Sequence, residues 1–170
     1  MISEIQIYVA CLAAYNNGIL HGEWIDATQS LDDMKVAVKS MLVASPIEDA
    51  EEYAIHDHEG FEGCSIGEYS SLETVHEFAS FIEEHGEIAH DLLAYFSGCT
   101  EEASKALEDS YLGEYDSVEN YARELTESCY TIPNILEFYI DYESMVRDME
   151  MSGDIFTIGS GNGIAVFCNH

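Results

Sequence analysis

The chain has 170 residues and carries 34 Asp and Glu against 5 Lys and Arg, for a formal net charge of -29 at pH 7. This balance excludes most nucleic-acid-binding and anionic-membrane proteins, because both of those ligands are polyanions. Hydrophobic residues make up 47% of the chain, which excludes a disordered acidic tail and predicts a folded protein with an acidic surface.

The five Cys residues are widely spaced, their number is odd, and none forms a C-x-x-C pair. We therefore expect reduced and mostly buried thiols, as in a cytoplasmic protein. The first residues lack the basic and uninterrupted apolar stretches of a signal peptide, and no apolar run reaches the length of a membrane-spanning helix. These patterns predict a cytoplasmic protein that makes no membrane contact.

The first 60 residues predict a small β-β-α-β unit. Residues 4–13 and 19–26 are rich in Ile, Tyr and Val and predict two strands, joined by turn residues at 15–18. Ser30 opens a near capping box and predicts a helix that runs to about residue 42. A third strand is expected over residues 52–57.

The middle of the chain is expected to be helical. Periodic apolar positions predict helices over residues 71–84 and 87–96, separated by Gly86. Thr100 is followed by two acidic residues and predicts the start of another helix, which closes at Gly113.

The last third mixes helices and strands. A helix capped by Ser117 is predicted over residues 117–128, and one or two short helices between Pro133 and residue 151. Two strands, over residues 154–158 and 164–168, are joined by a hairpin turn expected at Asn162-Gly163. Helices and antiparallel strands in this order predict an α+β fold.

The acidic residues need an explanation beyond solubility, because ordinary surfaces intersperse both signs of charge. A halophilic surface is one explanation, and imitation of DNA phosphates is another. Duplex DNA exposes on the order of 100 Å² per phosphate charge, whereas a compact monomer of this mass offers roughly 300 Å² per net charge. Mimicry therefore requires the acids to gather on one face of an elongated body, or two copies to extend the charged track.

The candidate acids for such a surface lie in the middle of the chain, where helical spacing brings carboxylates together. They are Glu62, Glu68, Glu73, Glu77, Glu83, Glu84, Glu87, Asp91, Glu101, Glu102, Glu108, Asp109, Glu114, Asp116 and Glu119.

Two alternatives from other functional classes stay open. A metal-dependent enzyme could use His56-Asp57-His58-Glu59, since imidazoles and carboxylates bind zinc or manganese. No second ligand cluster with recognised spacing accompanies this run, so we assign neither a metal nor a cofactor. The other alternative is an acidic binding module for a different basic protein. The glycine-rich run at 159–163 lacks a Lys and a following helix, which favours a hairpin over a phosphate-binding loop.

Three segments of the sequence carry a family resemblance. The first contains Tyr15-Asn16-x-Gly18 and Gly22-x-Trp24, and the second is the run EEYAIHD at 51–57, extending through Glu59. The third contains Ile132-Pro133-x-x-Leu136, Tyr139-Ile140-Asp141-Tyr142, Arg147-Asp148 and Ser152-Gly153. In order and spacing they resemble the ArdA antirestriction proteins over nearly the whole chain.

The resemblance implies a non-enzymatic mimic of bent DNA, of a kind typically carried by mobile genetic elements. Such proteins bind the DNA groove of type I restriction-modification enzymes, formed by the specificity and methyltransferase subunits, and block restriction and modification. No cofactor and no direct nucleic-acid contact are expected.

The resemblance also implies an elongated homodimer of three small subdomains. These are an N-terminal α/β subdomain (1–61), a central helical acidic subdomain (62–113), and a C-terminal subdomain of helices plus a β-hairpin (114–170) that carries the dimer contact. The segment 132–153 corresponds to the family's antirestriction motif. Its candidate motif and interface residues are Ile132, Pro133, Leu136, Tyr139, Ile140, Asp141, Tyr142, Arg147 and Asp148. The alternative for these residues is core packing with a buried Arg–Asp pair.

Overall fold

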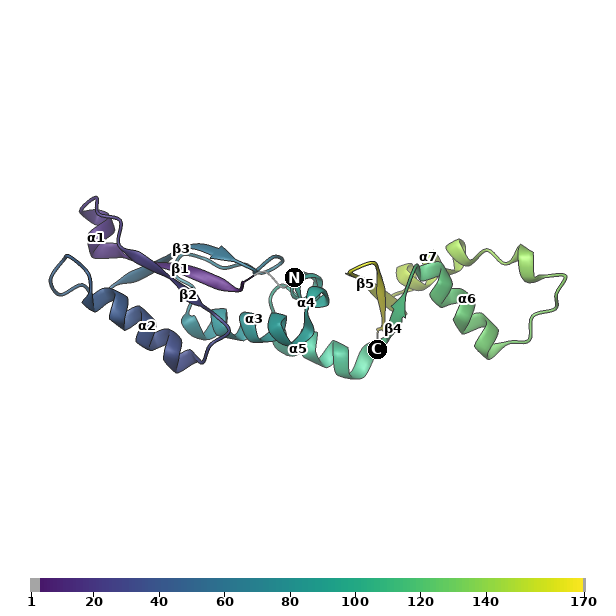
Figure 1. Cartoon of the computed structure of the whole chain (residues 1–170). Helices are drawn as coiled ribbons and strands as arrows, with labels where there is room; N and C mark the ends of the chain where they lie inside the picture. Colours follow the sequence, from purple (N-terminus) through teal and green to yellow (C-terminus); the bar gives the residue numbers. More distant parts are fainter. Residues whose placement is uncertain (1–3, 170) are drawn as a thin grey trace. The chain divides into compact units, whose positions relative to one another are not determined.

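The computed structural model describes residues 4–169, which divide into two compact units between Thr100 and Glu101. Each unit contains a three-stranded antiparallel sheet together with helices, so the predicted α+β class is confirmed (Figure 1). Among the described residues, no helix is long and apolar enough to cross a membrane. The division into three subdomains stays a prediction.

The first unit is built on a sheet with strand order β2-β1-β3. Alternation along β1 buries Ile7, Val9 and Cys11 completely, on the face that packs against α2. Ser30 begins α2 as predicted, because its hydroxyl accepts a hydrogen bond from the backbone N–H of Asp33. The elements are β1 (Gln6–Cys11), α1 (Leu12–Asn16), β2 (Gly22–Asp26), α2 (Leu31–Val43) and β3 (Tyr53–Glu59).

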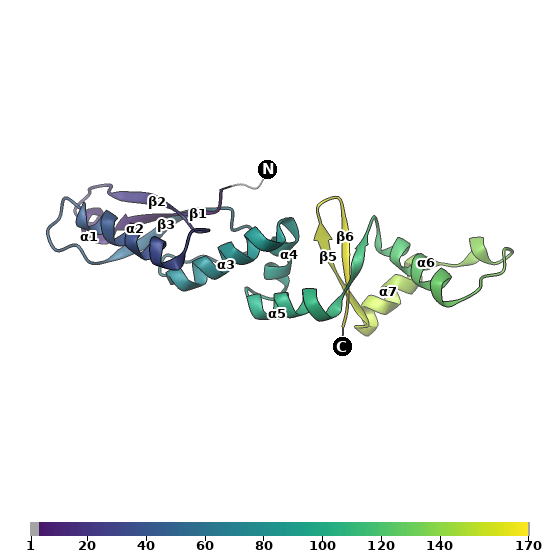
Figure 2. The same ribbon diagram turned by 60° about the horizontal axis from the view of Figure 1, so that its bottom comes forward.

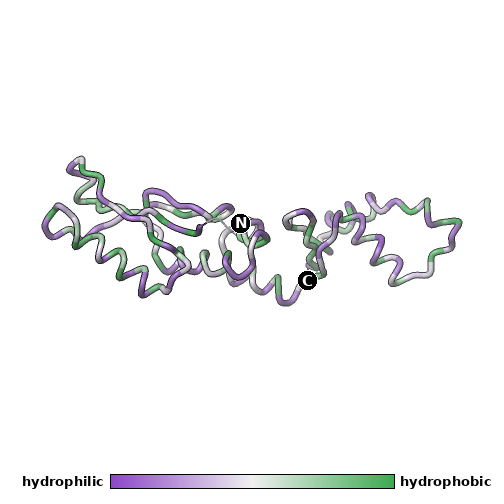
Figure 3. The backbone as a smooth tube through the Cα atoms, in the orientation of Figure 1, coloured by the Kyte–Doolittle hydropathy of each residue, from purple (hydrophilic) through white to green (hydrophobic). Residues whose placement is uncertain are grey.

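Helix α3 (Leu72–His85) completes the core of the first unit, and α4 (Glu87–Tyr95) packs against it. Six residues of α3 are buried, at the spacing of one helical face, and Ser71 caps its N-terminus. Gly86 ends the helix with a φ of 66°, a conformation that residues with a side chain rarely adopt. Short hydrophobic and hydrophilic stretches alternate along these helices (Figure 3), as expected when one face is buried.

The second unit has a sheet with strand order β4-β6-β5, against which α6 and α7 pack. Two small clusters form its core: one joins Tyr121 of α6 to Ile155 and Val166 of the sheet, and the other joins α6 to α7. Figure 2 shows β5 and β6 as an antiparallel hairpin. The elements are α5 (Thr100–Lys105), which begins at the boundary between the units, η1 (Ala106–Ser110), β4 (Tyr111–Tyr115), α6 (Val118–Cys129), η2 (Glu137–Tyr139), α7 (Tyr142–Ser152), β5 (Ile155–Ser160) and β6 (Gly163–Cys168).

The strand predicted over residues 4–13 is too long, because the chain forms α1 after Cys11. The side chain of Asn17 closes this short helix by donating to the carbonyl of Ala13 at 2.8 Å. Gly18 then turns the chain with a φ of 75°. The residues assigned to a simple turn therefore make a helical turn first, and β2 begins only at Gly22.

The helix predicted from Thr100 to Gly113 is wrong only in its last three residues, because the helical segments α5 and η1 end at Ser110 and residues 111–115 form strand β4. Tyr111 pairs with Phe167 of β6, and their rings lie 5.4 Å apart. Gly113 sits at a bulge in this pairing with a φ of 142°, which a helix does not permit. Pairing with a distant strand thus overrides the local helical signal.

Two predictions near the C-terminus also need correction. Pro133 begins a turn rather than a helix, since its carbonyl accepts from the N–H of Leu136 at 2.8 Å, but η2 and α7 are the two short helices expected after it. The β5–β6 hairpin turns at Gly161 and Asn162, one residue earlier than expected, because Ser160 and Gly163 are paired. Gly161 supplies the positive φ that such a turn requires.

Candidate functional site

The acidic residues all lie on the surface. Each of the 34 Asp and Glu side chains belongs to an exposed residue, and Thr100 is the only polar residue buried within residues 4–169. In the described part of the chain, two carboxylates pair with a Lys or Arg: Glu73 with Lys35 at 2.8 Å and Glu143 with Arg147 at 3.4 Å. The negative charge therefore faces solvent largely uncompensated.

Two of the candidate acids on α3 contact side chains of other segments of the first unit. The ammonium of Lys35 hydrogen-bonds Glu73, which lowers the pKa of this carboxyl and raises that of Lys35. Glu77 accepts a hydrogen bond from the hydroxyl of Thr100, at the end of the first unit. These contacts give Glu73 and Glu77 a structural role, and Lys35 compensates the charge of Glu73.

Among residues 4–169, the acids at the far end of α3 and on α4 pair with no Lys or Arg. Glu84 lies 3.9 Å from His85, whose imidazole is only charged when protonated. Glu62 and Glu68, in the loop after β3, lie 3.8 Å from His90 and 3.7 Å from His56. The structure thus gathers one group of exposed acids around the α3–α4 corner: Glu83, Glu84, Glu87 and Asp91.

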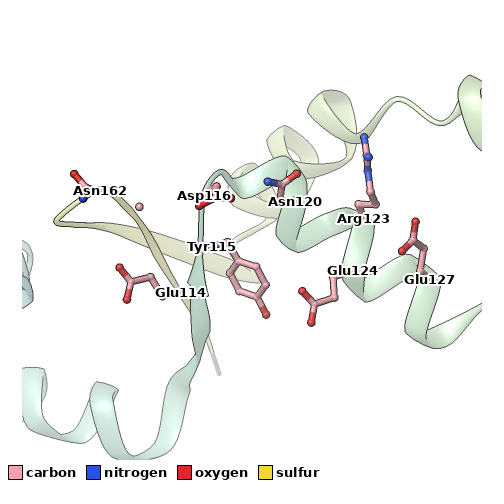
Figure 4. A pocket seen from close by; sticks show the side chains of 9 residues that line it. Glu114, Tyr115, Asp116, Asn120, Arg123, Glu124, Glu127 and Asn162 are labelled. Carbon is pink, nitrogen blue, oxygen red and sulfur yellow. The ribbon is translucent and has the colours of Figure 1, made fainter.

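In the second unit, β4, α6 and the β5–β6 turn surround an open acidic hollow of about 560 Å³ (Figure 4). Glu114 and Asp116 were predicted from the sequence, whereas Glu124 and Glu127 on α6 were missed. The spacing of three residues between these two would have placed them on one helical face. Glu101, Glu102, Glu108, Asp109 and Glu119 are also exposed in this unit but do not line the hollow.

The geometry of the hollow keeps its charge negative. Ser160 donates to Glu114 at 2.9 Å and fixes this carboxylate. Arg123, the one cation that lines the hollow, places its guanidinium 5.3 Å from the centre of the Tyr142 ring and extends away from Glu124 and Tyr115 (Figure 4). Burial, and next the charge of Glu124, raise the pKa of the Tyr115 hydroxyl above its ordinary value of 10.0.

The candidate metal ligands at 56–59 do not converge. His56 sits at a bulge in the pairing of β3 with β1 and packs edge-on against Tyr15, with ring centres 4.9 Å apart. His58 lies instead against Phe61, at 5.9 Å. Among residues 4–169, no group of three or more His, Cys, Asp or Glu side chains is arranged to hold a metal ion.

The chain between α6 and α7 exposes large apolar side chains. Phe138 is 90% exposed and Tyr139 is 82% exposed. Tyr130, Ile135 and Leu136 are exposed as well, so five large apolar residues within ten positions face solvent. We call residues 130–139 the apolar loop. An exposed patch of this kind marks an interaction site more often than a chance arrangement.

The six candidate motif residues without a charged side chain therefore fall into two groups. Leu136 and Tyr139 lie in the apolar loop, together with Ile132 and Pro133. Tyr142 is buried against Ala122 and Val146, and Ile140 packs on the same cluster, so core packing describes these two.

The polar members of the motif have local roles in α7. Asp141 caps the helix: the backbone N–H and hydroxyl of Ser144 donate to its carboxylate at 3.0 Å and 2.8 Å, which lowers the pKa of Asp141. Arg147 and Asp148 are both exposed, and Arg147 contacts Glu143. The buried Arg–Asp pair considered from the sequence is therefore wrong.

None of the five Cys residues, all of which lie within residues 4–169, forms a disulfide. Only Cys11 is buried, so the expectation of mostly buried cysteines is too broad.

The sequence matches the family model described as Antirestriction protein (ArdA) over residues 7–162, nearly the whole chain. A search of curated proteins returns no match.

Proposed function

The chain belongs to the ArdA antirestriction family, and on this premise we propose that it acts as a DNA mimic. It would occupy the DNA groove of a type I restriction-modification enzyme, at the specificity and methyltransferase subunits, and block both restriction and modification. The protein would act in the cytoplasm by binding alone, without catalysis and without a cofactor.

The exposure of every carboxylate is the observation that supports this proposal most strongly. A groove that grips DNA presents Lys and Arg side chains spaced to meet phosphates. Carboxylates are acceptors of the same charge and can take the same hydrogen bonds. The first unit has 19 acids against 2 cations and the second has 15 against 3, so both units offer such acceptors.

The energy of such an interaction is spread over many contacts. One exposed ion pair contributes only about 0.2–1 kcal/mol, so no single carboxylate supplies tight binding. Ten such pairs together supply on the order of 5 kcal/mol, and opposite charges also accelerate association. We therefore expect inhibition that depends on groups of acids and weakens with salt.

The total charge supports a second element of the proposal, a homodimer. The accessible surface of 10446 Å² carries a net charge of -29. This is roughly 360 Å² per charge, about a quarter of the charge density of duplex DNA. Two copies would present twice as many carboxylates to one enzyme, and we propose that the apolar loop is the contact between them.

The area of the apolar loop is consistent with this role. Five large apolar side chains, each exposing on the order of 100–200 Å², offer several hundred Å² per copy. A standard protein interface buries about 800 Å² per partner, so the loop can supply most of one. Leu136 and Tyr139 are the motif residues that we expect at its centre.

Competition binding tests the proposal. A purified type I methyltransferase core is bound to a labelled duplex, and the protein is titrated in at about 0.1 M and about 1 M salt, where the Debye length falls from about 10 Å to 3 Å. Displacement at near-stoichiometric protein, weakened at the higher salt, is expected. Failure to displace DNA at the lower salt would exclude mimicry for that enzyme and favour another basic protein as the partner.

A further inference from the structure

The two faces of the first sheet differ among the described residues, because α2 packs on one and the other carries an exposed Trp. Helix α2 packs on the face formed by Ile7 and Ile25, whereas Tyr8 and Trp24 point to the opposite side. The register places these two rings directly opposite each other, 5.5 Å apart and tilted by 58°. We call this surface the open sheet face.

Trp24 is the most unusual residue of this face. It is the only Trp of the chain, and 40% of it is exposed although the core lies one residue away at Ile25. Gly22 explains the arrangement, because a Cβ there would lie 2.7 Å from the hydroxyl of Tyr8. The missing side chain lets Tyr8 lie over Gly22, and Trp24 remains partly accessible to solvent.

Carboxylates surround the two rings. In register, Tyr8 is flanked by Trp24 on β2 and Asp57 on β3, and the next row on this face contains Asp26 and Glu59. The rows are two residues apart, or about 7 Å. The open sheet face therefore carries two aromatic rings within a frame of three acids.

Two of these carboxylates are held in place. Asp26 accepts from the backbone N–H and the hydroxyl of Thr28, at 2.8 Å and 2.7 Å. Glu59 accepts from the side-chain amide of Gln6 at 2.8 Å. These contacts leave the charges of both carboxylates uncompensated, since neither donor is a cation.

The rim of this face contains a hollow of about 510 Å³, lined by Trp24, Asp26 and Glu83 among others. The two Lys residues of the first unit, Lys35 and Lys39, lie on α2, which packs on the other face of the sheet, and the unit contains no Arg. A cation from outside the protein thus meets an aromatic ring and carboxylates at one place, where no Lys or Arg of residues 4–100 lies.

We infer that the open sheet face at Trp24 is a docking site for arginine side chains of a basic protein partner. This inference rests on the proposed function and identifies a contact beyond phosphate imitation. A guanidinium is planar and weakly hydrated, so it can stack on the Trp24 ring while its N–H groups reach Asp26 or Glu83. A lysine ammonium is more strongly hydrated and lacks the planar stacking surface, so arginine is preferred.

The single Trp makes the site directly observable. Tetra-arginine and tetra-lysine peptides are titrated into the full-length protein while the emission of Trp24 and its quenching by acrylamide are followed. Tetra-arginine is expected to change the emission and to protect Trp24 from acrylamide, with a response that persists in part at about 1 M salt, where long-range attraction is screened. An equal response to both peptides, or no response to tetra-arginine, would overturn the inference.

Three variants test the site in the competition assay against labelled DNA. Trp24→Phe keeps an aromatic face, Trp24→Leu keeps apolar bulk without one, and Tyr69→Ala removes an aromatic residue that is 76% exposed elsewhere in the same unit. We expect Trp24→Leu to weaken displacement roughly threefold to thirtyfold at both salt concentrations, and Trp24→Phe and Tyr69→Ala to have smaller effects.

The outcomes separate the two claims. If the wild-type protein displaces DNA and Trp24→Leu does so equally well, the arginine site is wrong and the proposed function stands. If the wild-type protein does not displace DNA, the proposed function is wrong for that enzyme, and the peptide titration still decides whether Trp24 binds arginine. Circular dichroism of Trp24→Leu and Trp24→Phe confirms that both variants retain the fold before they are compared.

Discussion

Replacing Tyr139 by Ser should convert the proposed dimer into monomers. An aromatic side chain buries about 150–250 Å², and Tyr139 is 82% exposed, so about 120–200 Å² of it is available to a partner. At about 25 cal/mol per Å² this area corresponds to about 3–5 kcal/mol as an upper limit, and truncation of a central aromatic residue typically costs about 2 kcal/mol or more.

The symmetry of a homodimer doubles this effect. In a two-fold interface each copy contributes the same residue, so one substitution removes two side chains from the contact. A loss of about 4 kcal/mol weakens the dimer roughly a thousandfold, which moves a micromolar dissociation constant to about millimolar. Because Tyr139 lies outside both core clusters, the free energy of unfolding of the monomer should change by no more than about 0.5 kcal/mol.

Sedimentation velocity over a wide range of protein concentration measures this change. The matched control is Leu20→Ser, which removes an apolar side chain that is 88% exposed in the first unit. The wild type and the control are expected to dimerise equally, and Tyr139→Ser to remain monomeric. A monomeric wild type, or a Tyr139→Ser dimer as stable as the control, would refute the assignment. Ile140 is unsuitable for this test, because it packs on the core and its loss would also destabilise the monomer.

Four exposed acids at the α3–α4 corner should act together: removing all four charges should weaken displacement of DNA by about tenfold to a thousandfold, and each single change by about fivefold or less. The substitutions are Glu83→Gln, Glu84→Gln, Glu87→Gln and Asp91→Asn, and abolition of inhibition by any one of them would contradict a distributed surface. The pKa of Asp141 in the folded protein is lower than its ordinary value of 3.8. The ionised carboxylate therefore stabilises the fold at pH values above 3.8, and this stabilisation is lost as the pH falls through the lowered pKa. Asp141→Ala should therefore lower the melting temperature at pH 7. Asp141→Asn should retain the helix cap but lose the part of the stability that depends on the ionised carboxylate. Thermal unfolding at pH 7 and pH 3 tests both expectations. Burial, and next the charge of Glu62, raise the pKa of the Cys64 thiol to about 11. Iodoacetamide at pH 8 should therefore modify Cys64 more slowly than it modifies the thiol of an ordinary peptide. Equal modification rates, measured by mass spectrometry, would be inconsistent with this pKa. Raising salt from about 0.1 M to about 1 M should increase the melting temperature while weakening inhibition, and a falling melting temperature would show that like-charge repulsion does not limit stability.

The sequence predicts best those features whose cause is local. Ser30, Ser71 and Ser117 each accept a hydrogen bond from the N–H three residues later, so the start of each helix is encoded within one turn. Strand β4 has no such signal, because its residues contain a Gly and a Glu and are held as a strand by pairing with β6, about 50 residues away. The apolar loop is similar, since its exposure follows from what α6 and α7 leave uncovered.

The candidate acidic surface could also be predicted from the sequence only in part. That the acids would be exposed follows from the cost of burying a charge, and the sequence predicts it. Which acids have partners does not follow, because Glu73 meets Lys35 and Glu77 meets Thr100 only after α2, α3 and the chain following α4 have packed. Glu124 and Glu127 were missed for a related reason: their hollow exists only when β4 and the β5–β6 turn lie beside α6.

The acids differ in whether their positions on the helices stabilise or destabilise those helices. Several helices have an acid in the first turn, such as Glu87 and Glu119, where the helix dipole stabilises negative charge. Glu83 and Glu84 lie instead in the last turn of α3, and Glu127 lies in the last turn of α6, where a negative charge costs about 0.3–1 kcal/mol. Glu83 also lines the hollow beside Trp24, and Glu127 lines the hollow in the second unit. Because these acids oppose the stability of their own helices, folding does not account for them, which is consistent with the proposed capture of a basic partner.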